Sequence, residues 1–408
     1  MRLAVALIEA QCQGQARHCS LVLAMISPRY VALGHPTIMQ VFMSSTTISS
    51  KNNPTAAADP RRINPAVPVP EDVDLIRTAA KVTRDLNTPK PVIYWADFLA
   101  SVAVGYGSLA GAIVSQSTGL AIFFGLIAIL ALYRAGSFIH ELTHVRRNAL
   151  PGFHFAWNAL FGVPMLIPSF MYEGIHSIHH RTKKYGTVED PEYLPLALMK
   201  PWSVPLFVVV AALAPVALLF RYAILSPLSA IIPPLRKIVV ERYSGLIINP
   251  DFRRKPPEGD LKRRWLACEI GASIWAIALL AMVATDVIPM RAFLIFLGVM
   301  SGSVILNQIR TLVAHLWEND GHEMSVTAQY LDSVNVPPPA TLPALWAPVG
   351  LRYHALHHLL PGVPYHSLGE AHRRLAAELP AESNFYRADH DRLWTLIMGL
   401  VRGSAGRN

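Results

Sequence analysis

The sequence predicts an all-α integral membrane protein, and three observations support this fold class. The chain of 408 residues is 52% hydrophobic but only 15% charged, whereas soluble proteins carry about 25% charged residues. Long apolar runs account for the difference, and they match the length of membrane-spanning helices. Histidines recur at helical spacing beside these runs. We expect four transmembrane helices in two hairpins, a re-entrant or interfacial helical element, and a cytoplasmic cap that carries the histidines.

Two of the apolar runs predict transmembrane hairpins. No charged residue lies between Phe98 and Tyr133, a run long enough for two short helices with a polar turn at residues 115–119. A second hairpin is expected from Trp265 to about Leu306, turning near residues 286–289. Each hairpin returns the chain to the side from which it entered.

A third apolar region, residues 204–232, contains several prolines and Arg221, and it is not expected to be a single span. Histidine boxes precede and follow it, so it must cross the membrane an even number of times if the boxes form one site. Its flanks are strongly basic, which places both of them in the cytoplasm by the positive-inside rule. The same rule accounts for the net charge of +9, and no interleaved basic and aromatic pattern indicates nucleic-acid binding.

Composition divides the chain into four predicted parts. They are a disordered or mis-annotated N-terminus (1–60), a basic cytoplasmic lead-in (61–92), a membrane domain (93–370), and a C-terminal cytoplasmic helix and tail (371–408). Translation starts at Met1 or Met43, and the lead-in contains an amphipathic stretch from Val73 to Asp85. The three cysteines have no metal-like spacing and indicate no disulfides.

The histidines carry the chemical signal. Eight of the sixteen form three boxes: His140-Glu-Leu-Thr-His144, His176-Ser-Ile-His179-His180 and His354-Ala-Leu-His357-His358. On a helix, positions i, i+3 and i+4 share one face, so each box can direct two or three imidazoles to one point. Imidazole binds iron, copper or zinc near neutral pH, and a zinc ion takes about four ligands. So many imidazoles therefore predict two metal ions.

A ninth histidine, His315, ends a polar stripe in the last predicted span. Asn307, Thr311 and His315 recur every four residues and so lie on one helical face. Polar side chains in a spanning helix tend to face a site or a cavity. We predict His315 as a further ligand, with Asn307 and Thr311 as candidates for contact with the site.

Other residues near the boxes allow two interpretations. The first box also matches H-E-x-x-H, the zinc-protease helix in which Glu141 would act as a base. Two further boxes have no role in such a protease, so we favour Glu141 as a partner that orients an imidazole. For the acidic residues that flank the second box, solvated loop charges are favoured over support of its imidazoles; they are Glu173, Glu189, Asp190 and Glu192. Histidines without paired spacing are expected to be surface or structural; they are His18, His35, His154, His322, His366, His372 and His390.

The three boxes, in this order around paired membrane helices, resemble those of the membrane fatty acid desaturases and related hydroxylases. Residues 310–315, RTLVAH, resemble the extra-histidine segment of many members, and the resemblance spans residues 92–370. It implies a non-haem di-iron centre, O2 as co-substrate, an external electron donor and an apolar tunnel for an acyl chain. The implied iron ligands are His140, His144, His176, His179, His180, His315, His354, His357 and His358.

The activity that this resemblance implies is O2-dependent desaturation of a fatty acyl lipid. The alternatives are a di-iron hydroxylase or ketolase for an alkyl, sterol or carotenoid chain, an intramembrane zinc protease, and a metal-binding protein without catalysis. We expect a lipid, acyl-CoA or acyl-carrier substrate, and a separate ferredoxin or cytochrome b5-type electron donor. The expected location is a membrane, with a bacterial inner membrane favoured and the boxes facing the cytoplasm.

Overall fold

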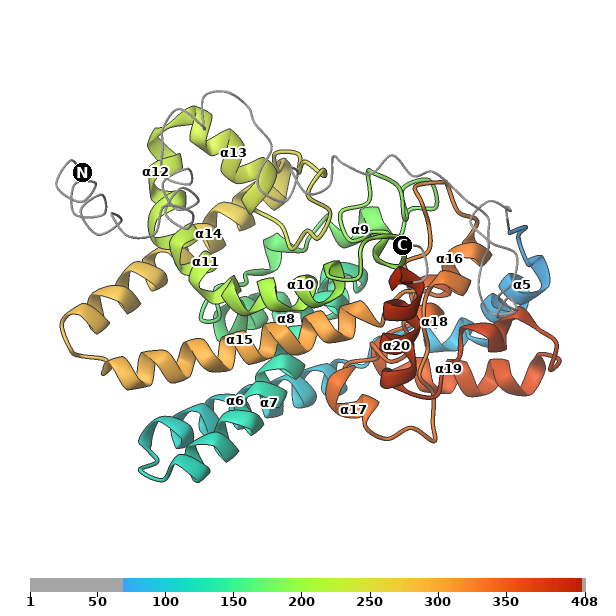
Figure 1. Cartoon of the computed structure of the whole chain (residues 1–408), viewed down its shortest axis with the longest axis horizontal. Helices are drawn as coiled ribbons and strands as arrows, with labels where there is room; N and C mark the ends of the chain where they lie inside the picture. Colours follow the sequence, from blue (N-terminus) through green and yellow to red (C-terminus); the bar gives the residue numbers. More distant parts are fainter. Residues whose placement is uncertain (1–68, 406–408) are drawn as a thin grey trace. The chain divides into compact units, whose positions relative to one another are not determined.

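Helices make up the fold in the computed structural model, which describes residues 69–405 (Figure 1). Within this range β-pairing is limited to isolated bridges, one of which joins His315 to Ser333. The all-α prediction is therefore confirmed for the described residues. The predictions for residues 1–60, including the start at Met43, lie outside them.

Both predicted membrane hairpins are present. α6 (Pro91–Val114) and α7 (Thr118–His144) pack along each other, while α14 (Gly259–Ala284) and α15 (Met290–Leu312) diverge from their turn, so that α15 packs on α7 instead (Figure 1). Close packing of the first pair depends on Gly105, because a Cβ there would lie only 2.6 Å from Leu132 Cδ2. Small residues let membrane helices approach closely in this way.

The third apolar region forms a nearly continuous helical run from Ser203 to Ile231. Its parts are α10 (Ser203–Val209), η6 (Val210–Leu213), α11 (Ala214–Phe220), η7 (Arg221–Leu225) and α12 (Ser226–Ile231). The run is long and apolar enough to cross a membrane, so the described residues contain five candidate spans and not the four that we predicted. However, it changes direction between α10 and α12 (Figure 1).

Contacts on either side of this run bear on its topology. After the run, Leu246 N donates to Met171 O at 2.8 Å and Ile248 N donates to Pro191 O at 2.9 Å, and both acceptors precede the run. The segments that precede and follow the run therefore contact each other. This favours an even number of crossings, and the four-span topology with its cytoplasmic cap stays a prediction.

A buried ionic cluster joins the run to α13 (Pro233–Tyr243) and α14. The guanidinium of Arg221, which is 3% exposed, donates to Glu269 Oε1 at 3.0 Å. Arg236 on α13 donates to Glu269 Oε2 at 2.8 Å, and Trp265 Nε1 donates to the same oxygen at 3.1 Å. A charge inside an apolar segment needs such partners to be tolerated.

The remaining helices are short, and several of them carry or support the histidines. They are α5 (Val73–Val82), η1 (Arg84–Leu86), η2 (Arg147–Ala149), α8 (Phe153–Trp157), η3 (Asn158–Gly162), η4 (Ser169–Met171), α9 (His176–His179), η5 (Leu196–Leu198), α16 (Val326–Asp332), α17 (Pro343–Trp346), α18 (His354–Leu359), α19 (Tyr365–Glu378), η8 (Asn384–Ala388) and α20 (Leu393–Ala405). α5 lies in the predicted amphipathic stretch. α19 runs across the predicted boundary at residue 370, because Leu368 and Leu375 share one buried face against α5 and α18.

Candidate metal centre

Each histidine box lies on a helix or includes the residue that caps it. The first box forms the end of α7, so one helix provides both a membrane segment and two imidazoles. The second box is α9 together with its C-cap residue His180, and the third begins α18. His315 lies three residues beyond the end of α15, where it pairs with Ser333.

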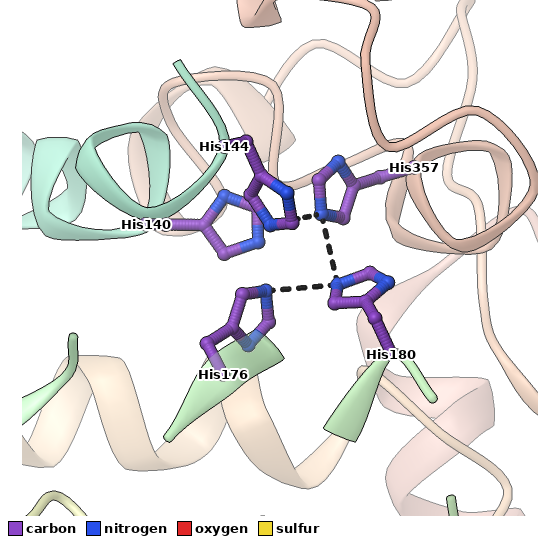
Figure 2. Close-up of side chains that lie close together, drawn as sticks. All are labelled: His140, His144, His176, His180 and His357. Carbon is purple, nitrogen blue, oxygen red and sulfur yellow. Dashed lines mark hydrogen bonds between the residues drawn. The ribbon is translucent and has the colours of Figure 1, made fainter. Parts of the chain in front are cut away.

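The nine histidines named as ligands from the sequence come together in two groups. The five-histidine group consists of His140, His144, His176, His180 and His357, and the four-histidine group consists of His179, His315, His354 and His358. Within each group, one ring nitrogen of every histidine lies within 4.8 Å of those of the other members. Figure 2 shows the five rings turned toward a common centre from α7, the second box and α18.

Helical geometry explains how the boxes divide between the groups. Residues i and i+4 lie on one face of a helix, whereas adjacent residues point about 100° apart. His176 and His180 therefore enter the five-histidine group together, and His179 enters the other group. In the third box the i, i+4 pair belongs to the four-histidine group and His357 to the five-histidine group.

The two groups are neighbours. The ring centroids of His180 and His358, which belong to different groups, are 4.4 Å apart, and those of His179 and His358 within the four-histidine group are 4.9 Å apart. Two metal ions held by these rings would therefore occupy adjacent positions. This arrangement suits chemistry that needs two metals at one place.

The ring nitrogens have the surroundings of metal ligands. His357 Nε2 lies 3.1 Å from His144 Nε2 and 3.2 Å from His180 Nε2. Both ring nitrogens of the buried His140 lack a hydrogen-bond partner among the described residues, and an unsatisfied buried polar atom destabilises a fold. A metal ion would satisfy these converging nitrogens, so the residues fit one ion in each group.

The protonation state of the third box also favours metal binding. Burial lowers the pKa of His357 and His358 well below the usual value, and the neighbouring imidazoles lower it further. The rings are therefore neutral near pH 7, which is the form of imidazole that binds a metal.

Two carboxylates lie against the Nδ1 atoms of histidines in the second box. Asp190, which is 0% exposed, lies 2.8 Å from His179 Nδ1, and Glu192 lies 3.1 Å from His176 Nδ1. A carboxylate at Nδ1 fixes the ring and leaves Nε2 to the metal. Burial opposes protonation of His179, but Asp190 outweighs it and raises the pKa of that ring. Burial also raises the pKa of Glu192 to about 7.

Our interpretation of the acidic residues as solvated loop charges is therefore wrong for Asp190 and Glu192. It is also wrong for Glu173, whose carboxylate lies 2.9 Å from Arg147 Nη2 and 3.1 Å from His154 Nε2 in a largely buried position. Glu189 alone of the four is exposed, in an ion pair with Lys184.

His315 has an equivalent support on the other side of the site. Its Nδ1 lies 2.8 Å from the hydroxyl oxygen of Tyr185 and 3.1 Å from that of Ser333. The Tyr185 hydroxyl donates to Asp332 at 2.7 Å, so its oxygen can accept from the imidazole. Burial raises the pKa of Asp332 to about 7. His315 is thus oriented through a tyrosine to a buried carboxyl group.

Glu141 is buried beside the five-histidine group. Its carboxylate accepts hydrogen bonds from the Tyr94 hydroxyl and from Tyr365 N, the latter at 3.1 Å. Its nearest approach to His140 Nδ1 is 3.8 Å, which is too long for a hydrogen bond. Glu141 therefore links the first box to α6 and α19, and it does not hydrogen-bond the imidazole as we predicted.

Of the predicted polar stripe, His315 belongs to the four-histidine group, but in the described part of the chain Asn307 and Thr311 are not hydrogen-bonded to the site. Asn307 is exposed, and the hydroxyl of Thr311 donates to the Asn307 carbonyl at 2.9 Å. Among the described residues, no hydrogen bond joins either side chain to a site histidine. α15 instead presents Arg310, which we had not singled out, and its Nη2 lies 3.0 Å from His354 Nδ1. The missed signal was a charged residue near the end of an apolar helix.

Comparison with known proteins shows to which family the chain belongs. The family model described as fatty acid desaturase matches residues 115–390, a range that contains all nine histidines. The chain belongs to the fatty acid desaturase family. A ceramide hydroxylase of Caulobacter vibrioides is 47% identical to this member of the family over 337 residues, which is 83% of this chain and 96% of the relative.

Membership of the desaturase family makes this chain a multi-pass membrane oxidoreductase. The desaturase family is known for di-iron centres, and the two histidine groups offer the ligands that such a centre requires. The first box contributes to the same group as the second and third boxes, so its H-E-x-x-H pattern is part of a desaturase-type site. The zinc-protease interpretation is accordingly dropped.

The described histidines outside the boxes have other partners or positions. His154 contacts Glu173, His372 contacts Asp389 at 2.9 Å, and His366 Nε2 accepts a hydrogen bond from Lys90 N at 3.1 Å. None of the three belongs to either histidine group. This agrees with the structural roles that we expected for them.

Proposed function

We propose that this chain is an O2-dependent ceramide hydroxylase of the desaturase family. One C–H bond of the lipid is replaced by C–OH, and the balance is C–H plus O2, two electrons and two protons giving C–OH plus water. The observation that carries this proposal is the 47% identity to a ceramide hydroxylase over 96% of that protein's length. It favours the hydroxylase alternative over the desaturase that we expected from the sequence.

The nine histidines are the proposed iron ligands, five for one ion and four for the other. When bound, two ferrous ions supply the O2-activating chemistry that no side chain provides. The residues of the chain hold and orient that centre. Asp190 and Glu192 fix the second box, Tyr185 orients His315, and burial of the rings keeps bulk water from the reacting groups.

Desaturation is the second candidate, because the matching family is described as fatty acid desaturase. Both reactions begin with removal of hydrogen from an unactivated C–H bond, and they differ in the second step. Return of oxygen to the carbon gives an alcohol, whereas removal of hydrogen from the adjacent carbon gives an alkene. Positioning of a single methylene decides between them.

The electron supply and the orientation in the membrane belong to the same proposal. A separate ferredoxin or cytochrome b5-type protein delivers the two electrons on the side that carries the histidine boxes. That side is the cytoplasmic face of a bacterial inner membrane. Support comes from the basic segments that flank the boxes, since such segments are retained in the cytoplasm and attract acidic partners.

The decisive test follows the oxygen atom. Membranes that contain the protein are supplied with a ceramide, a reducing system and 18O2, and the lipids are analysed by mass spectrometry. We expect a ceramide heavier by one labelled oxygen, and none from a His357→Ala variant. A product lighter by two hydrogens and free of label would establish the desaturase instead. If ceramide is unchanged while a fatty acyl lipid is converted, the substrate assignment is wrong.

A further inference from the structure

An uncharged segment with an exposed middle directly precedes the third histidine box in the sequence. From Ser333 to Leu351 the sequence contains no Asp, Glu, Lys or Arg, and its middle is the short helix α17. The side chain of Leu342, just before this helix, is 67% exposed, and that of Leu345, within it, is 51% exposed. A surface of this kind, without any charge, is unusual for a segment that faces water.

The position of α17 is fixed by contacts with membrane helices. It packs on α7 and α15, both of which are candidate spans, and the Tyr133 hydroxyl donates to Trp346 O at 3.0 Å. Tyr133 is the last residue of the uncharged run that fills the first hairpin. The next residue, Arg134, forms an ion pair with Asp97 at 2.6 Å. α17 therefore lies at the level where α7 leaves the hydrocarbon.

We propose that residues 337–347 insert Leu342 and Leu345 among the acyl chains of the bilayer. α7, on which α17 packs, also carries large exposed apolar side chains, because Ile122, Phe123 and Leu126 are each more than half exposed. Transfer of a leucine side chain from water to an apolar environment is favourable, so insertion stabilises the exposed leucines. Trp346 stands at the boundary, where tryptophan is enriched in membrane proteins.

Hydrogen bonds of Arg352 connect the same segment to the part of the chain that carries the third box. Arg352 donates through Nε to Val336 O and through Nη2 to Ala340 O, both at 2.8 Å. These hydrogen bonds connect the beginning of the segment to the residue that follows it. Two residues later His354 belongs to the four-histidine group and contacts Arg310 of α15. The segment is therefore joined along the chain directly to the third box.

Site-directed fluorescence tests the insertion. In a background where Cys12, Cys19 and Cys268 are serines, Leu345→Cys is labelled with an environment-sensitive fluorophore and the purified protein is reconstituted into vesicles. Brominated phospholipids quench from within the bilayer and iodide quenches from water. Phe123→Cys on α7 is the lipid-facing control, and Val188→Cys, which replaces a 67% exposed side chain near the second box, is the control outside the spans.

We expect brominated lipid to quench the label at Leu345 at least half as strongly as at Phe123, with little quenching by iodide. The label at Val188 should show the reverse. Quenching at Leu345 by iodide would overturn the proposal by placing the segment in water. Resistance to both quenchers would overturn it too, since protein would then cover the segment. Leu342→Cys repeats the measurement in case the first variant does not fold.

Discussion

Single side chains behind the imidazoles decide how well the rings can hold a metal. The Nδ1 atoms of His176 and His179 each face a buried or half-buried carboxylate, and that of His315 faces a tyrosine hydroxyl. Such partners raise the basicity of the ligand and fix its orientation. These carboxylates and the tyrosine therefore support metal binding by orienting the histidines, although they are not proposed as metal ligands.

Replacing Asp190 by Asn should weaken metal binding at the four-histidine group. The ring of His179 loses the carboxylate that fixes it, and loss of such a partner lowers metal affinity about 10- to 100-fold. Competition with a chelator, followed by iron analysis, measures the effect. The matched control is Glu189→Gln, one position away but exposed in an ion pair with Lys184. Equal iron retention by the two variants would remove Asp190 from this role.

Removing a ligand should have a larger effect than removing its partner. His140→Ala and His357→Ala each take one imidazole from the five-histidine group. We expect loss of turnover and loss of at least one of the two irons per chain, measured by elemental analysis of purified protein. His366→Ala should change neither, because His366 lies outside both groups and accepts a backbone hydrogen bond. Full iron content in His357→Ala would exclude the third box from that group.

Whole helices position these side chains, and their packing depends on charges placed inside apolar segments. The bent run from Ser203 to Ile231 is joined to α14 by the pair of Arg221 with Glu269. Arg236 shares the same carboxylate from α13. Because Arg221 and Glu269 are buried, the cluster is more sensitive to loss of either of them than a surface ion pair would be.

Glu269→Gln should therefore destabilise the membrane domain without touching the histidines. It leaves the buried guanidinium of Arg221 without its carboxylate, a change that costs about 3–5 kcal/mol in buried pairs. Thermal unfolding in detergent should show a clear fall in Tm. Glu241→Gln, which removes only a long contact to the exposed Lys237, should leave Tm close to that of the unmodified protein. A small effect at Glu269 would mean that the cluster contributes little to packing.

For the complete chain, the main question is how often it crosses the membrane. Contacts such as Leu246 N with Met171 O connect the segments before and after the bent run. A single crossing would place these segments on opposite faces of the bilayer. The contacts favour a shared face, as expected from the basic flanks, and the number of crossings stays a prediction.

Cysteine accessibility in spheroplasts tests this topology. Val188→Cys and Glu258→Cys place thiols at exposed positions before and after the run. Both should resist an impermeant maleimide added outside and react after the membrane is opened. Labelling of one from outside and the other only from inside would establish a single crossing. Labelling of both from outside would keep the even number but reverse the orientation.

The sequence by itself determined the all-α class, both hairpins and the nine histidines, because these depend on local properties. Apolar length sets a span, and i, i+4 spacing sets a helical face. The spacing did not decide how each box divides, because i+3 and i+4 both share a face with i; the structure places His179 in a different group from His176 and His180. Family membership followed from the boxes.

Other features depended on residues far apart in the chain, and only the tertiary structure decided them. The pairing of His357 with the first box, the burial of Asp190 behind His179, and the contact of Arg310 with His354 join separate segments. An acidic residue in a polar loop looks the same in sequence whether it is solvated or buried. The surrounding fold removes its water, and this desolvation turns the carboxylate into a support for a metal ligand.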